Sequence, residues 1–351
     1  MDLQLAMSII EKSFFCAREG EFLEFDFHGG EIALAFDRIK EICEWTWSKT
    51  WNNDYVFHAT TNGTLIHGDI KEWFSSNSHR FSLGLSLDGT REMHNINRCD
   101  SYDDIDFDFF LRSWPNQTVK MTVSPQTISE IDKGVIHIIH KGFDVSANLA
   151  YGQKWEGNEL RVSYLKALSN LVNFYLNNPE LKVCNIVNTG LCEIGKRYIL
   201  NMPNYHRKWC GTGDDMQCYG ICGQELPCQM FNPSSNQQDK AKDIDNVTYD
   251  FSNIAIKDCQ NCIILPSCPS CYGYSYIINH EISKCPDELC DFRKIEFLAS
   301  SYLYGQMLLD PKKYSLTRYL NDKQIACIII SIKMIQDEFR NEFKKKWRVF
   351  A

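Results

Sequence analysis

The sequence predicts an α/β protein with a parallel sheet, followed by a cysteine-rich region and C-terminal helices. Short apolar or alternating runs recur at steps of about 30 residues through the first half of the chain, and helical patterns lie between them. This rhythm is typical of βαβ units. The stretch 201–290 then changes character, because it is rich in Cys, Gly, Pro and Asn and poor in long periodic segments. We expect that stretch to be held together by something other than a large apolar core.

Each predicted strand ends in a turn or a polar cluster, and amphipathic helices lie between the strands. Parallel pairing requires such crossovers, because the chain must return to the same end of the sheet before the next strand begins. The predicted strands occupy 22–27, 55–60, 81–87, 119–124, 145–150 and 182–187. The predicted helices occupy 4–19, 34–49, 69–77, 103–114, 128–141, 158–176, 292–309 and 322–347.

Composition narrows the class of protein. The chain has 351 residues, a formal net charge of -8 and an apolar fraction of 44%, which is typical of a globular protein. The acidic balance argues against a general nucleic-acid binder, and no apolar run approaches the roughly 18 residues of a membrane span. Residues 1–19 lack the basic start and apolar core of a signal peptide. We expect a cytoplasmic protein without nucleic-acid or membrane partners, in a reducing compartment where clustered cysteines more often bind metal than form disulfides.

Seven of the 16 cysteines follow a regular spacing in the second half of the chain. Two C-x2-C pairs are separated by five residues, another cysteine follows, and an upstream pair has the spacing C-x12-G-x4-C. Repeated pairs of this kind hold several thiolates within reach of one metal centre. The pattern alone fits tetrahedral zinc and iron–sulfur clusters about equally well. The seven are Cys210, Cys228, Cys259, Cys262, Cys268, Cys271 and Cys290.

Glycine and polar residues stand at the ends of four successive predicted strands. Strand ends at one rim of a parallel sheet or barrel are where such folds bind ligands. Glycines let the backbone approach a ligand closely, and the neighbouring side chains provide polar groups. One such turn is ordinary in any α/β protein, but four in order indicate a binding site. They are Gly29-Gly30-Glu31, Thr60-Thr61-Asn62-Gly63-Thr64, Ser86-Leu87-Asp88-Gly89 and Thr122-Val123-Ser124-Pro125.

This series resembles the radical S-adenosylmethionine (SAM) enzymes. The stretch Phe25-Asp26-Phe27-His28-Gly29-Gly30-Glu31 is similar to the family's GGE motif, which by resemblance holds the amino group of SAM's methionine moiety. The segments 61–65 and 86–89, with His94 and Arg98 after them, resemble the next two strand ends. The resemblance implies a (β/α)6 radical SAM barrel over 1–200. It also implies a SAM site formed by Gly29, Gly30, Glu31, Asn62, Ser86 and Arg98.

The cysteine pattern resembles that of the radical SAM subfamily with a SPASM domain: C-x(9–15)-G-x4-C, then C-x2-C-x5-C-x3-C, then a last cysteine. The chain departs from it in the x2 spacing between Cys268 and Cys271. The resemblance implies two auxiliary [4Fe-4S] clusters in a domain over 201–310, with a helical extension over 311–351. The resemblance strongly favours iron–sulfur clusters over zinc as the metal centres. Either Cys285 or Cys290 could supply the last ligand, and we expect Cys290 because it opens the following helix as in the family.

The family's defining C-x3-C-x2-C motif, which holds the catalytic [4Fe-4S] cluster, has no counterpart in these residues. It belongs on the loop after the first barrel strand, ahead of the GGE strand, and only Cys16 precedes Gly29 here. We therefore expect a partial barrel that lacks its first strand, with helix 4–19 or a partner over the open edge of strand 22–27. Two explanations stay open: a fragment whose first strand lies upstream, which we favour, or a degenerate member. A separate polypeptide could also complete the barrel.

The Cys-Pro-Ser-Cys-Tyr-Gly sequence at 268–273 is similar to maturases of ribosomally made peptides. The resemblance implies hydrogen abstraction from a bound peptide or protein substrate and its modification or crosslinking, with the chain inactive as given. In the related sulfatase-maturating enzymes, an Asp after the second auxiliary cysteine accepts a proton. Gln229 follows Cys228 here and cannot, which favours crosslinking over formylglycine chemistry. The alternatives are a non-catalytic iron–sulfur module that binds a peptide or a partner, and a zinc-structured scaffold.

Overall fold

Five parallel strands in chain order form the centre of the computed structural model. β1 (Leu23–Phe27), β2 (Tyr55–Thr61) and β3 (Phe81–Leu85) make one sheet, and β4 (Thr118–Val123) pairs with β5 (Asp144–Leu149). The amide of Leu87 donates to the carbonyl of Lys120 over 2.9 Å and links the two sheets. The structure describes residues 1–115, 117–202, 210–213, 215–232, 259, 261–279, 282, 287–314 and 320–340.

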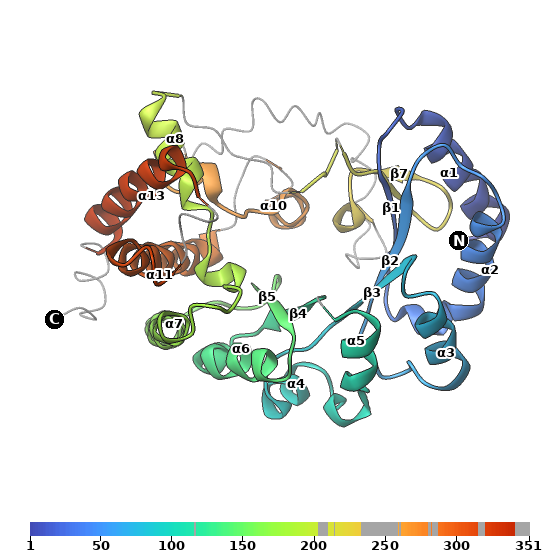
Figure 1. Ribbon diagram of the computed structural model, residues 1–351, viewed down its shortest axis with the longest axis horizontal. Coiled ribbons are helices and arrows are strands. Elements are labelled where there is room, and N and C mark those ends of the chain that lie inside the picture. Colours follow the sequence, from blue (N-terminus) through green and yellow to red (C-terminus); the bar gives the residue numbers. More distant parts are fainter. Residues whose placement is uncertain are drawn as a thin grey trace.

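Helices cover one face of these strands and leave the other face toward the centre of the molecule (Figure 1). The apolar side chains of each strand, such as Phe57, Leu83 and Met121, are buried against the helices. The helices on this outer side are α2 (Phe36–Trp47), α3 (Gly68–Ser76), α4 (Arg91–Asn97), α5 (Phe107–Ser113), α6 (Ile131–His140) and α7 (Asn158–Asn177). Short 3-10 turns precede three of them: η1 (Ile32–Ala35), η2 (Tyr102–Asp104) and η3 (Ile128–Glu130).

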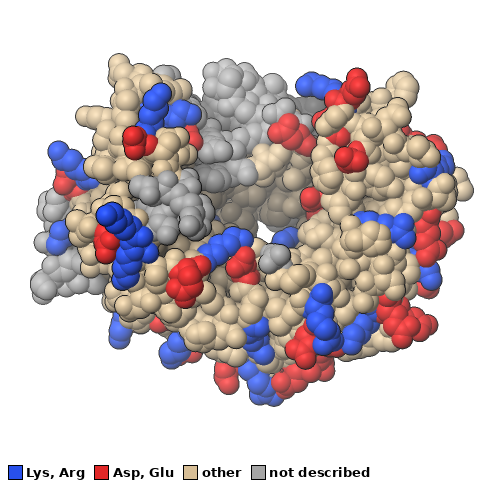
Figure 2. All heavy atoms as spheres, in the orientation of Figure 1, with Lys and Arg blue, Asp and Glu red and all other residues tan. Residues whose placement is uncertain are grey.

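The inner face of the strands is polar and accessible to solvent. Alternate residues along a strand point to opposite faces, so the residues between the buried apolar positions face inward. None of these inward polar residues is fully buried, and Figure 2 shows the molecule hollowed at its centre, with acidic and basic side chains around the opening. The inner-face residues are Glu24, Asp26, His58, Thr60, Ser82, Lys120, Thr122, Ser146 and Asn148.

The predicted strand over 182–187 is wrong. This segment instead ends in the 3-10 turn η4 (Asn185–Val187), which lies beside β5. The side chain of Asn185 replaces the missing strand pairing: its amide donates to the carbonyl of Ala147 over 2.9 Å, and its oxygen accepts from the amide of Ala147 over 2.8 Å. One side chain thus satisfies both backbone groups of a fully buried residue, and no further ladder is needed at this position.

Replacing Asn185 by Ala should destabilise the protein by about 2 kcal/mol, because it leaves the buried N–H and C=O groups of Ala147 without partners. Urea unfolding measures this loss. Asn173→Ala is the control, since Asn173 is exposed on α7 and its replacement should change stability by no more than about 0.5 kcal/mol. Equal effects of the two substitutions would contradict the proposed pairing role.

α1 (Leu3–Cys16) packs beside α2 and reaches β1, where the ring of Phe14 lies 5.4 Å from that of Phe25. β1 pairs with β2 and, within the described ranges, with no second strand. The hairpin of β6 (Cys218–Tyr219) and β7 (Glu225–Leu226) also meets α1, because Lys12 forms an ion pair with Glu225. The predicted N-terminal helix therefore exists and contacts β1, while cover of the open strand edge stays a prediction.

Three further helices pack together at the end of the barrel-like half, by which we mean residues 23–177, where parallel strands alternate with helices. They are α8 (Leu191–Ile199), α11 (Cys290–Leu309) and α13 (Asp322–Ile335), and α11 lies along α7. Gly195 lets α8 and α13 cross closely, because a Cβ there would lie 1.9 Å from the carbonyl oxygen of Cys327. A π-helical segment (Gln336–Arg340) follows α13, so the predicted helix 322–347 agrees as far as 340 and then leaves the described residues.

Shorter helical elements lie within the cysteine-rich stretch. They are η5 (Gln229–Phe231), η8 (Leu265–Ser267), α10 (Tyr272–Asn279) and η9 (Asp287–Leu289). In the part of the chain that the structure describes, no helix has both the length and the apolar character to cross a bilayer.

Candidate functional site

The GGE loop is joined to the end of β2 by the carboxylate of Glu31. One carboxylate oxygen accepts the hydroxyl of Thr61 over 2.6 Å, and the other accepts the amide of Asn62 over 2.9 Å. Glu31 also caps η1 by accepting from the amide of Ala33 over 3.1 Å. Gly29 and Gly30 are exposed, and a Cβ built on either meets no atom within 4 Å. This loop is therefore anchored at Glu31 and open at its glycines.

The β2 loop has its own internal bonds. The side-chain oxygen of Asn62 accepts from both the amide and the hydroxyl of Thr64, each over 2.9 Å. Gly63 has a φ of 84°, a left-handed conformation that glycine adopts without strain. A Cβ at Gly63 would also lie 3.0 Å from Leu85 on β3. These constraints explain the Asn-Gly-Thr sequence at the strand end independently of any ligand.

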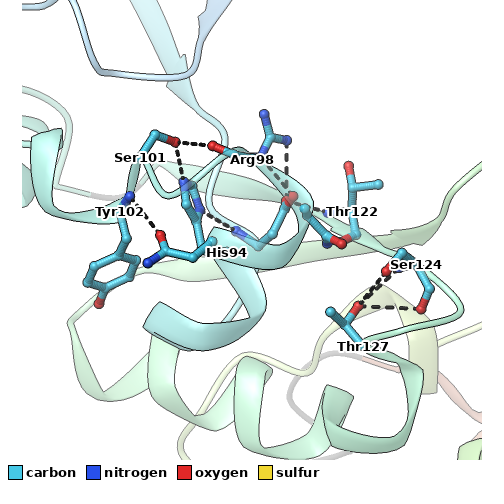
Figure 3. A network of polar contacts seen from close by, with 10 residues as sticks. His94, Arg98, Ser101, Tyr102, Thr122, Ser124 and Thr127 are labelled. Carbon is cyan, nitrogen blue, oxygen red and sulfur yellow. Dashed lines mark hydrogen bonds and ion pairs between the residues drawn. The ribbon is translucent and has the colours of Figure 1, made fainter.

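Asp88 organises the ends of β3 and β4, within the polar network in which Figure 3 labels Arg98, His94 and Thr122. Its carboxylate is buried, accepts from the Arg98 guanidinium over 2.7 and 3.2 Å, and accepts the amide of Thr122 over 2.8 Å. Ser86 directly follows β3 and bridges its neighbours, because its amide donates to the carbonyl of Thr61 over 2.9 Å and it pairs with Lys120 on β4. A charged pair with such bonds fixes the guanidinium in one place while leaving it partly exposed, with 25% of the side chain accessible.

The imidazole of His94 supports the same network through hydrogen bonds at both of its ring nitrogens. Its Nδ1 accepts the amide of Asp88 over 3.2 Å, so its Nε2 carries the proton and donates to the hydroxyl of Ser101 over 3.2 Å (Figure 3). Burial lowers the pKa of His94 to about 4; Asp88 opposes this shift and Arg98 adds to it. His94 is therefore neutral at physiological pH and serves as a hydrogen-bonding support for Asp88.

The burial of His94 predicts that the free energy of unfolding decreases as the pH is lowered. The pKa of His94 is about 4 in the fold and 6.5 in an ordinary environment, so the unfolded chain binds the proton first as pH falls. Neutral His94 therefore contributes its full share of the folding stability above pH 6.5. This share, about 3 kcal/mol at most, is lost as the pH falls toward 4. Urea unfolding at several pH values measures it.

A His94→Gln variant should lose less stability between neutral and acid pH than the wild type, because glutamine takes up no proton. His79→Gln is the matched control, since His79 is exposed. It should keep the wild-type pH dependence. The same acid slope in the wild type and in His94→Gln would contradict the assignment.

The strand-end residues predicted from the sequence thus come from neighbouring elements. Glu31 contacts the amide of Asn62 directly, and Ser86 bonds to the adjacent strand end. Arg98 joins this rim through Asp88. Asp88 is a supporting residue that the sequence prediction did not include among the site residues, although its place in the strand-end motif marks it.

The seven cysteines of the predicted pattern divide into two neighbourhoods. Burial raises the pKa of Cys268; Arg293 lowers it, and the nearby thiols of Cys290, Cys262 and Cys259 raise it further. Burial also raises the pKa of Cys271, an effect that the Tyr274 amide opposes and that Cys228 and Cys210 increase. The first group is Cys259, Cys262, Cys268 and Cys290, and the second is Cys210, Cys228 and Cys271.

Cys218 lies close to the second group. Burial raises its pKa, and the nearby Cys228 and then Asp26 raise it further. The sequence pattern did not single it out, because it stands between the motif cysteines. Within the described residues, no three Cys, His, Asp or Glu side chains already stand close enough together to hold a metal ion. The other candidate for the last ligand, Cys285, lies outside the described residues.

Close packing explains why two positions of the cysteine-rich stretch are glycines. Gly223 has a φ of 81° at the β6–β7 turn, and a Cβ there would lie 3.0 Å from Leu5 on α1. Gly273 lets α10 approach η5, because a Cβ would lie 2.4 Å from that of Met230. A small separate core of Phe231, Tyr272 and Tyr276 then surrounds Cys228. The glycines of the cysteine motif therefore shape the backbone that presents the thiols.

The chain is similar to known sulfatase-maturating enzymes. It is 35% identical over 103 residues to the cysteine-type anaerobic sulfatase-maturating enzyme of Clostridium novyi (strain NT), a match that covers 29% of this chain and 26% of that protein. The cysteine-type enzyme of Clostridium perfringens (strain 13 / Type A) is 38% identical over 81 residues, or 22% of this chain and 20% of that protein. The matches therefore span about a quarter or less of these relatives. No family model matches the chain.

Solved structures extend the similarity to most of the fold. Histidine-tagged anSMEcpe with bound AdoMet matches with a TM-score of 0.64 and 18% identity, over 94% of this chain and 89% of that chain. Native anSMEcpe with bound AdoMet and Kp18Cys peptide matches with a TM-score of 0.62 and 18% identity, over 91% of each chain.

These comparisons confirm the predicted resemblance and the α/β fold class. The missing barrel strand and the domain boundaries stay predictions. The chain has the fold of anSMEcpe, and over about a quarter of their length its sequence resembles the cysteine-type anaerobic sulfatase-maturating enzymes.

Proposed function

We propose that this chain is a radical SAM peptide maturase, which modifies or crosslinks a ribosomally made peptide. The observation that supports the proposal is the strand-end rim from Glu31 to Arg98, beside a polar inner face whose Asp26 lies close to Cys218. Structures with this fold contain AdoMet and a peptide at once. A peptide or protein substrate and SAM are therefore the ligands that we assign to the central opening.

Six residues would hold SAM: Gly29, Gly30, Glu31, Asn62, Ser86 and Arg98. The open glycines provide backbone groups, and the partly exposed guanidinium of Arg98 provides a fixed positive charge for a carboxylate. The Glu31 carboxylate is already bonded to the β2 loop, so its role is to set the distance between the two loops as well as to face the ligand. When bound, SAM supplies the radical that removes a hydrogen atom from the peptide, and iron–sulfur clusters carry electrons.

The thiols are sufficient in number for two [4Fe-4S] clusters, although no three of them in the described residues already stand close enough together to hold a metal ion. Cys259, Cys262, Cys268 and Cys290 would hold one, and Cys210, Cys228 and Cys271 the other, with Cys218 as its fourth ligand. Arg293 lies beside the first group, where it lowers the pKa of Cys268 against the larger effect of burial. Its guanidinium is held by Glu296 over 2.9 and 3.0 Å. This buried cation would offset part of the negative charge of thiolate ligands.

Anaerobic reconstitution should give about eight irons per chain, and loss of one ligand group should leave about four. Cys268→Ser and Cys271→Ser should therefore each remove about half the iron, from different clusters. Iron analysis and visible absorbance measure this outcome. Cys99→Ser is the control, because Cys99 is exposed and far from both patterns in the sequence. Zinc in place of iron, without visible absorbance, would instead support the zinc-structured scaffold.

These 351 residues contain no C-x3-C-x2-C motif, and this observation favours a second candidate, a non-catalytic iron–sulfur module that binds a peptide or a partner. We expect the chain to produce no 5′-deoxyadenosine from SAM and dithionite, because the electron donor of the reaction is a cluster on that motif. Joining a first strand and a C-x3-C-x2-C loop to its N-terminus should restore production. Glu31→Ala in the joined protein should lower it again.

Two outcomes would decide against parts of this proposal. Production of 5′-deoxyadenosine by the unextended chain would show that the catalytic cluster has other ligands. Silence of the extended protein with a full iron complement would favour the binding module.

A further inference from the structure

The inner face of the barrel-like half holds an acid–base pair that the proposed SAM and cluster sites do not use. Asp26 on β1 and His58 on β2 stand directly opposite each other in the parallel register. The Nδ1 atom of His58 lies 3.0 Å from the carboxylate of Asp26. Both side chains point into the opening, with 43% of Asp26 and 18% of His58 exposed. The pair is thus joined by a hydrogen bond and is still accessible to a ligand.

This geometry sets the tautomer of His58. A carboxylate accepts but does not donate, so the His58 proton resides on Nδ1 and the lone pair resides on Nε2. Gly84 on β3 leaves the space near Nε2 without a side chain, since a Cβ there would lie 3.5 Å from that atom. Nε2 is therefore oriented as a proton acceptor, with Asp26 placed to stabilise the imidazolium that would form.

The position of the pair connects the two proposed sites. Asp26 precedes the Gly29-Gly30-Glu31 loop by three residues, and it is also close enough to Cys218 to raise the pKa of that thiol, after the larger effects of burial and Cys228. A peptide in the central opening would meet the pair between the strand-end rim and the cysteines. The other charged groups around it are His28, 4.0 Å from Asp26, and Lys120, which donates to Thr60 over 2.8 Å.

We propose that the Asp26–His58 pair is the proton acceptor for a cysteine thiol of the bound peptide. In this step the S–H bond breaks, the proton forms an N–H bond at His58 Nε2, and the electron pair stays on sulfur as a thiolate. The Asp26 carboxylate balances the resulting imidazolium charge. The transfer needs no oxidant or reductant. A thiol is the suitable donor, because an ordinary thiol titrates near pH 8.5 and an imidazole near 6.5, a gap small enough to be closed on binding. Gln229, next to Cys228, cannot take this role.

The inference rests on the proposed peptide-binding function, and two measurements on the complete chain separate them. In the first, ¹⁵N-histidine NMR reports the tautomer of His58, whose signal is the one lost in His58→Gln among the nine histidines. The wild type should show a protonated Nδ1 and an unprotonated Nε2 at pH 8. Asp26→Asn should remove this preference. Glu24→Gln, a neutralised acid two residues away on the same face of β1, should keep it. An unchanged tautomer in Asp26→Asn would overturn the pair.

In the second measurement, a cysteine-containing peptide is alkylated with iodoacetamide across a pH range, with and without the protein, and its product is counted by mass spectrometry. Binding to the wild type or to Glu24→Gln should lower the apparent pKa of the peptide thiol by about one unit, equivalent to about tenfold more thiolate at a pH well below that pKa. His58→Gln and Asp26→Asn should bind the peptide without this shift. A merely structural ion pair would leave the thiol titration the same in all four proteins, and that result would overturn the inference alone. Failure of the wild type to bind any such peptide would overturn the proposed function with it.

Discussion

The structure depends on the separation of apolar and polar residues to opposite faces of five parallel strands. The outer positions bury Phe57, Leu83, Met121 and their neighbours under the helices, and this burial is the main source of stability in the first half of the chain. Because side chains alternate, the same strands must present their other residues toward the centre. There the residues are polar, and the space remains open. The polar inner face is therefore a direct consequence of how the core is built.

Parallel pairing adds a second consequence, since it brings all the strand ends to one rim. Two carboxylates then connect loops that are distant in sequence. Glu31 joins the GGE loop to the end of β2, and Asp88 joins Arg98 to the end of β4. Asp88 is fully buried, so its charge requires the guanidinium and the backbone amide that it contacts. Each of these groups therefore satisfies a hydrogen-bonding group of a neighbouring loop.

The cysteine-rich half follows a different principle. Part of its described residues form a small apolar core around Cys228 and Phe231, while others, such as Ile264 and Leu289, join the extensive main core. Glycines at 223 and 273 bring backbone segments together at distances that a side chain would prevent. The fold thus combines a barrel-like half stabilised by extensive apolar burial with a cysteine-rich stretch whose described residues are shaped by close backbone contacts at glycines.

The sequence by itself determined the order of five strands and of the helices predicted between them, the strand-end motifs and the spacing of the motif cysteines, because each is a local pattern of a few residues. Five of six predicted strands are present within two residues at either end. The sixth, over 182–187, failed because the side chain of Asn185 takes over the backbone pairing of Ala147, a long-range contact that apolar character does not reveal. Tertiary structure alone decided which cysteines are neighbours and placed Cys218 near Cys228. It also brought Asp26 opposite His58, since their register depends on how β1 pairs with β2 across an intervening helix.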